Sequence, residues 1–134
     1  MTEKLHQHLS AALAATPVGS LCVAFSGGAD STALLHALAA SPQARGRGLR
    51  AVHVDHGLQA ASAEWAEHCR RFCASLHVPF EVLRVQPAHG RGEGLEAAAR
   101  HARRAAFERM LRPGEWLVLA HHRDDQAETV LLKL

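Results

Sequence analysis

The sequence predicts an α/β protein built on a doubly wound, Rossmann-like parallel sheet, with helices on both faces in three α/β/α layers. Short apolar runs alternate along the chain with longer amphipathic segments. The short runs are continuously apolar, which is typical of strands buried on both faces. Strand–helix alternation at this spacing favours right-handed crossovers and parallel pairing. The 134 residues, 48% of them hydrophobic, suffice for one domain and are too few for two.

The first strand is the clearest element. Residues 21–25 (LCVAF) contain no polar side chain, so we expect a strand buried on both sides. The segment before it, residues 1–15, carries apolar residues at helical spacing, namely Leu5, Leu9, Ala12 and Leu13.

The remaining elements follow from the same two patterns. Further strands are predicted at residues 49–54, 80–85 and 116–120, and further helices at 31–40, 62–76, 95–111 and from Asp124 onward. Residues 86–94 hold one proline and three glycines and are predicted to form a loop, and Pro113-Gly114 predicts a turn. The apolar run 130–134 is read as the end of the last helix. It stops without a cap or breaker, so we expect the chain to be a fragment of a longer protein.

Composition narrows the function classes. The formal net charge of +2 neither demands nor excludes a nucleic-acid partner. An odd number of cysteines without a secretory signal favours reduced thiols in a cytoplasmic protein. Cys69 and Cys73 share a helix face without a CxxC pair, so we interpret them as buried apolar thiols. No apolar stretch reaches membrane-spanning length, and we expect no membrane contact.

Three polar segments follow predicted strands at their carboxyl ends: residues 26–31, 55–57 and 121–125. In open α/β sheets, ligands bind beyond the carboxyl ends of the strands, near a switch in strand order. We therefore expect these segments to meet at one edge of the sheet.

The first of these segments predicts a phosphate cradle. It consists of Ser26, Gly27, Gly28, Ala29, Asp30 and Ser31. The glycines permit a tight turn and a close approach of backbone N–H groups to an anion, and the following helix points its positive end at the same place. The Gly-Lys-Ser/Thr of the Walker loop is absent, which disfavours an ordinary P-loop NTPase. The alternative is a plain turn in which Asp30 or Ser31 caps the helix.

Residues 26–31 resemble the signature loop of the PP-loop family, the N-type ATP pyrophosphatases, whose fold is adenine nucleotide alpha hydrolase-like. Residues 53–58 (HVDHGL), 95–100 (LEAAAR) and 120–129 (AHHRDDQAET) resemble segments of one group within it, the tRNA(Ile)-lysidine synthases. The matches run from Ser26 to the end of the chain. The resemblance implies that ATP is cleaved between its α and β phosphates.

The resemblance also implies a reaction and its components. A ligase of this group adenylates the wobble cytidine of tRNA(Ile) with a CAU anticodon, and free L-lysine displaces AMP to form lysidine. The expected cofactors are ATP and Mg²⁺. Because the group continues well past Leu134, residues 1–134 are expected to be the N-terminal part of the PP-loop ATP-binding domain, without the rest of the catalytic domain or the tRNA-binding domains. A homodimer is left open.

Carboxylates near the cradle are candidates for catalysis. Divalent ions at phosphates take oxygen ligands, and Asp30, Asp124 and Asp125 are the candidates, with Asp30 and Asp125 preferred. Asp124, Asp125 and Glu128 are also candidates for holding the lysine ammonium, since Asp125 and Glu128 would share a helix face. The alternative is helix capping by an aspartate with a solvated Glu128.

Further residues are assigned to the site. Val54, Asp55 and His121 are expected to contact the nucleotide, with Asp55 on the adenine side. Arg100 belongs to a matching segment and is expected to serve catalysis. Arg103 and Arg104 either contact RNA phosphates or form a solvated face.

Two other functions compete. Histidines 53, 56, 121 and 122 alternate with aspartates as in a two-metal phosphoesterase, but His53 falls inside a strand and the cradle would be unexplained. A related PP-loop tRNA cytidine thiolase is the other alternative, although such enzymes usually need CxxC pairs, which are absent here.

Overall fold

The computed structural model describes residues 2–15, 18–55, 61–85, 93–123 and 126–132. In chain order its elements are α1 (Thr2–Ala15), β1 (Leu21–Ala24), α2 (Ala29–Ala39), α3 (Pro42–Arg47), β2 (Leu49–Asp55), α4 (Ser62–Ser75), β3 (Phe80–Arg84), α5 (Glu93–Met110), β4 (Trp116–Arg123) and β5 (Gln126–Leu132).

The described strands form one sheet in the order β3-β2-β1-β4-β5. β1 pairs in parallel with β2 on one side and with β4 on the other, and β2 pairs in parallel with β3. The predicted four-stranded parallel arrangement is therefore confirmed. The fifth strand, β5, runs antiparallel to β4.

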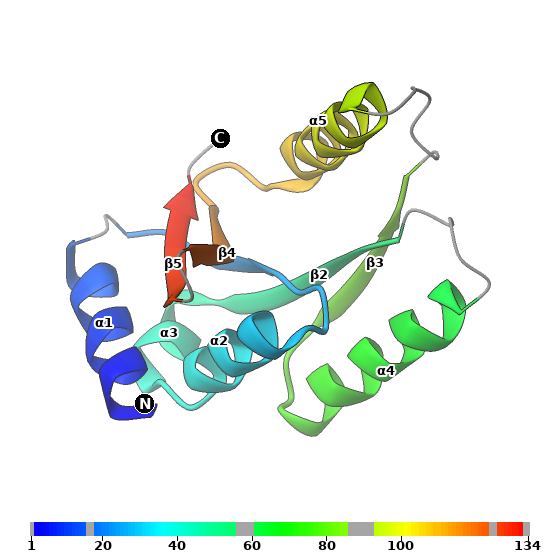
Figure 1. The fold of residues 1–134 in the computed structure, drawn as a ribbon. Helices are drawn as coiled ribbons and strands as arrows, with labels where there is room; N and C mark the ends of the chain where they lie inside the picture. The colour runs from blue at the N-terminus through cyan, green and yellow to red at the C-terminus, as the bar shows by residue number, and fades with distance from the viewer. Residues whose placement is uncertain (1, 16–17, 56–60, 86–92, 124–125, 133–134) are drawn as a thin grey trace.

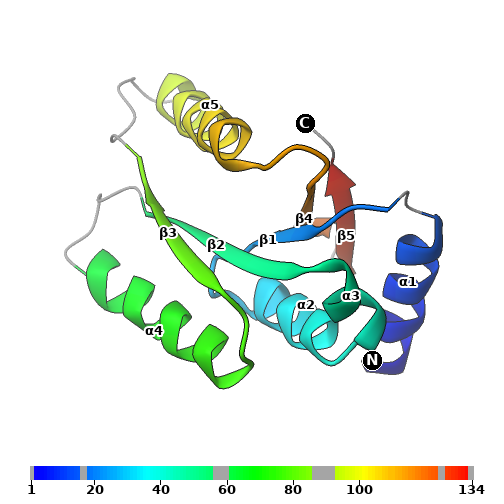
Figure 2. The same cartoon turned by 180° about the vertical axis from the view of Figure 1, so that it is seen from behind.

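Helices cover both faces of the sheet, as predicted (Figures 1 and 2). Helices α1, α2, α3 and α4 lie on one side and α5 lies on the other. The side chains of β1 alternate between the two layers: Leu21 and Val23 pack in the larger core, and Cys22 packs in the smaller one with Phe107 of α5. Because all three side chains are fully buried, β1 has the double-sided burial that its apolar run predicted.

The prediction of a helix from Asp124 onward is wrong. Residues 126–132 form β5, and β4 extends to Arg123 rather than ending near Ala120. Pairing with β5 satisfies backbone groups along the outer edge of β4. Thr129 and Val130 are β-branched and suit a pleated strand. Glu128 lies in β5, so it has no helix face to share with Asp125, which lies outside the described residues.

A short helix, α3, was not predicted. It begins after Ser41, whose hydroxyl accepts from the Ala44 N–H at 3.2 Å, and Pro42 occupies the start of the helix. Both residues are typical of a helix N-terminus. Gly46 and Gly48 disfavour a helix, which is why the sequence did not predict this one. So short a helix is stable only because it packs against α2 and β2.

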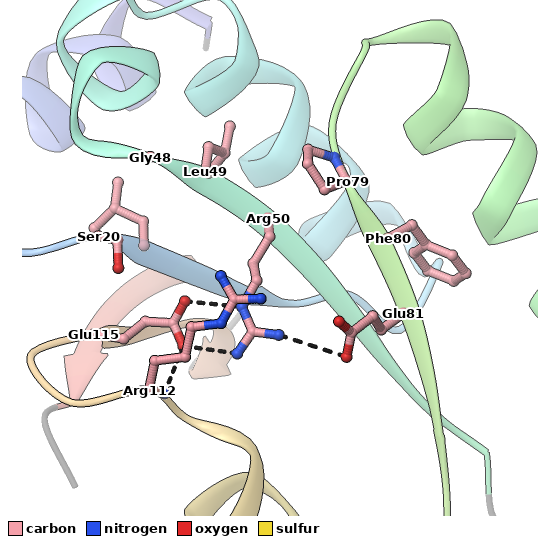
Figure 3. A pocket seen from close by; sticks show the side chains of 10 residues that line it. Ser20, Gly48, Leu49, Arg50, Pro79, Phe80, Glu81, Arg112 and Glu115 are labelled. Carbon is pink, nitrogen blue, oxygen red and sulfur yellow. Dashed lines mark hydrogen bonds and ion pairs between the residues drawn. The ribbon is translucent and has the colours of Figure 1, made fainter.

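A buried ion pair joins the amino-terminal ends of the strands (Figure 3). The Arg50 guanidinium donates to both carboxylate oxygens of Glu115 at 2.8 and 2.7 Å, and the two side chains are only 8% and 1% exposed. Arg50 belongs to β2 and Glu115 immediately precedes β4, so the pair spans the two neighbours of β1. It borders a cavity of about 400 Å³ at this edge, opposite the edge where residues 26–31 lie.

The surroundings of Glu115 keep it ionised. Burial opposes the charged form, but hydrogen bonds from the Arg50 side chain and the Arg112 backbone N–H outweigh it and lower the pKa of the Glu115 carboxyl. Arg50 also donates to the Met110 carbonyl at 3.1 Å and lies 3.6 Å from a Glu81 carboxylate oxygen.

Removing the Glu115 carboxylate should leave the buried Arg50 guanidinium with only the more distant and exposed Glu81 carboxylate as its counter-charge. We expect Glu115→Ala to lower the free energy of unfolding by about 3–5 kcal/mol, measured by urea denaturation at neutral pH. Glu108→Ala is the matched control, because Glu108 pairs with Arg104 at 3.4 Å on the exposed face of α5 and exposed pairs contribute little. Equal losses in the two variants would contradict the role assigned to Glu115.

The same pair should make stability depend on pH. The folded pKa of Glu115 lies below its unfolded value, so its contribution is present above the unfolded pKa and is lost as pH falls through the folded pKa. We expect the difference in unfolding free energy between the parent and Glu115→Ala to shrink on acidification. If the unfolding free energies of the two proteins changed equally with pH, the proposed contribution of Glu115 would be ruled out.

Candidate functional site

The strand order places a topological switch at β1. The chain passes from β1 to β2 and β3 on one side and then crosses to β4 on the other. In such sheets the carboxyl ends of the two strands at the switch form the ligand crevice. Residues 26–31 leave β1 at that point and lead directly into α2, which begins at Ala29.

The backbone of this loop has the form that its glycines allow. Gly27 has a φ of +87°, a conformation that favours glycine. Gly28 is the extended N-cap of α2 and no side chain caps the helix. The alternative in which Asp30 or Ser31 caps the helix is therefore wrong, since both lie within its first turn. The positive end of the α2 dipole thus lies at this loop, where it favours an anion.

Two hydroxyls and two amides converge in the loop. The Gly27 N–H donates to Ser31 Oγ and the Gly28 N–H donates to Ser26 Oγ, each at 3.2 Å. The two hydroxyl oxygens lie 2.9 Å apart. Ser31 is buried and Ser26 is exposed. The loop thus gathers neutral donors at the positive end of a helix, which is the arrangement expected of a phosphate cradle.

Helix α4 packs against this loop. A Cβ added to Gly27 would lie 2.8 Å from Cys69 Sγ and 3.0 Å from two ring carbons of Trp65. The Trp65 indole N–H donates to the Ser26 carbonyl at 2.7 Å. Only glycine fits here, for reasons of space as well as backbone conformation.

His53 and the cysteines are structural. His53 Nδ1 lies 3.0 Å from the Phe25 carbonyl in the buried interior of β2, which disfavours it as a phosphoesterase metal ligand. Burial raises the pKa of the Cys69 thiol to about 11 and that of Cys73 to about 12. The prediction of buried apolar thiols is confirmed.

The other predicted site residues are placed to different degrees. Asp30 is half-buried in the first turn of α2, and Asp55 is buried at the carboxyl end of β2. Val54 packs toward the smaller core beside α5. The structure therefore brings the cradle, Asp30 and Asp55 to one edge of the sheet.

The remaining candidates are located by backbone alone or not at all. His121 is paired in register with Glu128 in the β4–β5 ladder, and Arg100 lies in α5 on the opposite face of the sheet. Asp124 and Asp125 lie outside the described residues, as do the competing ligand His56 and residues 86–92 of the loop predicted at 86–94. The last two residues of that prediction are wrong, because α5 begins at Glu93. No cluster of three metal-binding side chains occurs among the residues that were described.

Sequence reasoning missed the support that α4 gives to the cradle. Trp65, Cys69 and Cys73 recur at four-residue spacing and so form one stripe of α4. That stripe was visible in the sequence, but its meeting with Gly27 depends on how α4 packs beside β2 and β3.

The two glycines of the cradle should respond differently to substitution. We expect Gly27→Ala to cost roughly 1–3 kcal/mol of stability from backbone strain and to weaken nucleotide binding, because its Cβ would collide with α4. Gly28→Ala should preserve the fold, since its φ is −74° and the added Cβ would meet only Ser26 Oγ at 3.5 Å. Thermal melting and ATP-binding calorimetry would test this; a Gly27→Ala protein with parental melting would contradict it.

Comparisons with known proteins agree with this architecture. The family model described as the PP-loop domain matches residues 1–134. The chain is 60% identical over 121 residues to the tRNA(Ile)-lysidine synthase of Xanthomonas axonopodis pv. citri (strain 306), covering 90% of the chain and 28% of that protein. It is 54% identical over 132 residues to the tRNA(Ile)-lysidine synthase of Alkalilimnicola ehrlichii, covering 98% of the chain and 29% of that protein.

The chain thus spans less than a third of the length of these relatives.

Among the described helices, none combines the length and the apolar character needed to cross a membrane.

Proposed function

The chain belongs to the PP-loop family, and on that premise we propose that residues 26–31 bind the phosphates of ATP for the reaction of a tRNA(Ile)-lysidine synthase. The observation that carries the proposal is the convergence of the Gly27 and Gly28 amides with two serine hydroxyls at the start of α2. The similarity to lysidine synthases over 90% of the chain supports the choice of substrate.

The proposed reaction has two steps. An oxygen of the wobble cytosine bonds to the α-phosphorus of ATP, and the bond from that phosphorus to the bridging oxygen breaks, releasing pyrophosphate. The uncharged amine of L-lysine then forms a C–N bond at the activated carbon, and AMP leaves with the oxygen. The cradle acts in the first step, because its donors stabilise the negative charge that accumulates on the departing pyrophosphate.

The cradle itself supplies hydroxyl and amide donors without a positive side chain, so a cation is needed to neutralise the phosphates. Mg²⁺ takes oxygen ligands and is usually held by one or two carboxylates together with substrate phosphates. The carboxylate of Asp30, half-buried one residue from Ser31, fits this chemistry. We propose Asp30 and Asp125 as the residues that would hold Mg²⁺.

Lysine and the anticodon would be bound by segments on the same edge. Glu128 pairs with His121, beyond the last residue of β4 that pairs with β1. This position of Glu128, near the carboxyl end of β4, supports the proposal that Asp124, Asp125 and Glu128 hold the lysine ammonium. Arg100 is proposed to act from the α5 side, and Val54, Asp55 and His121 to contact the nucleotide.

A cytoplasmic location is part of the proposal. It accords with the free, buried state of the cysteines, which are Cys22, Cys69 and Cys73. Their burial also removes them from the role that exposed cysteine pairs play in thiolases.

The function is tested with the complete protein that carries this chain. Incubation with ATP, Mg²⁺, L-lysine and tRNA(Ile) bearing a CAU anticodon should add one lysine to one cytidine, seen by mass spectrometry of the digested tRNA. AMP and pyrophosphate should form in equal amounts. AMP formation without a lysine adduct would reject lysidine synthesis in favour of another PP-loop reaction.

Replacing Ser31 tests the role of the cradle in the reaction. Its hydroxyl contacts the Gly27 N–H and the Ser26 hydroxyl, so we expect Ser31→Ala to lower kcat/KM for ATP roughly 10- to 100-fold, the range for hydrogen bonds to charged groups. Ser75→Ala is the control, because the Ser75 hydroxyl donates to the Phe72 carbonyl on the exposed end of α4. An unchanged kcat/KM in Ser31→Ala would remove the cradle from the mechanism.

A further inference from the structure

Trp65 is an exposed aromatic residue with a specific polar contact. Its indole N–H donates to the Ser26 carbonyl at 2.7 Å, although the side chain remains 45% exposed. Its ring also stacks on His68, with centroids 4.9 Å apart. The buried positions of α4 are Ala66, Cys69 and Cys73, so the packing of this helix on the sheet does not depend on the indole.

The contact fixes one peptide unit of the cradle. The Ser26 carbonyl and the Gly27 N–H belong to the same planar peptide group. Trp65 holds its oxygen, and Ser31 Oγ accepts from its N–H at 3.2 Å. A peptide plane held at both ends cannot rotate without breaking a hydrogen bond, and the direction of the Gly27 N–H is thereby set.

The two preceding peptide units, Ala24–Phe25 and Phe25–Ser26, are each held by one contact. The Phe25 N–H donates to the Val52 carbonyl at 2.8 Å, and the Phe25 carbonyl lies 3.0 Å from His53 Nδ1. A carbonyl oxygen can only accept, so this ring nitrogen carries the proton. Nδ1 then cannot accept from the Cys69 thiol, whose hydrogen is directed to the Ser26 carbonyl at 3.9 Å.

We propose that Trp65 is a positioning residue for the phosphate cradle, holding the Ser26–Gly27 peptide so that the Gly27 N–H keeps the Ser31 hydroxyl in place to bind the phosphates of ATP. The inference rests on the proposed function. Trp65 acts through the loop, since its polar contact is to the backbone of Ser26 rather than to a reacting group. Binding of ATP should therefore suffer more than the chemical step.

The test compares two tryptophan variants of the complete protein. Trp65→Phe keeps an aromatic ring and removes the N–H, and we expect the KM for ATP to rise about 3- to 10-fold, as for loss of one hydrogen bond, with kcat changed less than about 2-fold. Trp116→Phe is the matched control at the start of β4, on the opposite edge of the sheet, and should keep the parental KM. Trp65→Leu also lacks the donor and must raise KM as well.

Tryptophan fluorescence shows whether a ligand changes the surroundings of Trp65, and the effect on KM without one on kcat or on melting separates positioning from a purely structural role. ATP or pyrophosphate should change the emission of the parent and of Trp116→Phe, and that change should disappear in Trp65→Phe at an unchanged melting temperature. Parental KM and a parental fluorescence response in Trp65→Phe would overturn the inference. A parent that neither binds ATP nor releases pyrophosphate would instead overturn the proposed function.

Discussion

The burial of β1 on all sides is the constraint on which the rest of the structure depends. Its two edges are occupied by β2 and β4, and its side chains fill both cores. A strand held in this way has a fixed carboxyl end, so the loop that leaves it starts from a rigid point. The Arg50–Glu115 pair closes the opposite edge by joining the two neighbours of β1. The buried ion pair and the candidate site thus lie at opposite ends of β1.

The cradle is shaped by contacts from outside its own segment. Gly27 can approach α4 because it lacks a Cβ, and the same close approach brings Trp65 and Cys69 to the Ser26 carbonyl. The glycine serves packing and backbone conformation at once. Because Gly27 has no side chain, helix α4 can approach the loop closely enough to hold it.

Much of the fold could be predicted because its signals are local. The apolar run of β1 and the alternation of elements predicted the parallel sheet and the loop that joins β1 to α2. β5 could not be predicted, because residues 126–132 are a strand only through pairing with β4, a partner that local pattern does not reveal. The support from Trp65 was missed for a related reason: a four-residue stripe shows which side chains share a face, not what that face meets.

The sequence by itself determined the order of elements from α1 to β4 apart from the short α3, the double-sided burial of β1, the glycines of the loop and the family. Each follows from short-range chemistry: apolar periodicity, the conformational freedom of glycine, and donors placed before a helix. The tertiary structure alone decided which side chains hold those donors in place. Ser26 and Trp65 are 39 residues apart, and Arg50 and Glu115 are 65 apart. Contacts of that separation arise only when strand order and helix packing bring distant segments together.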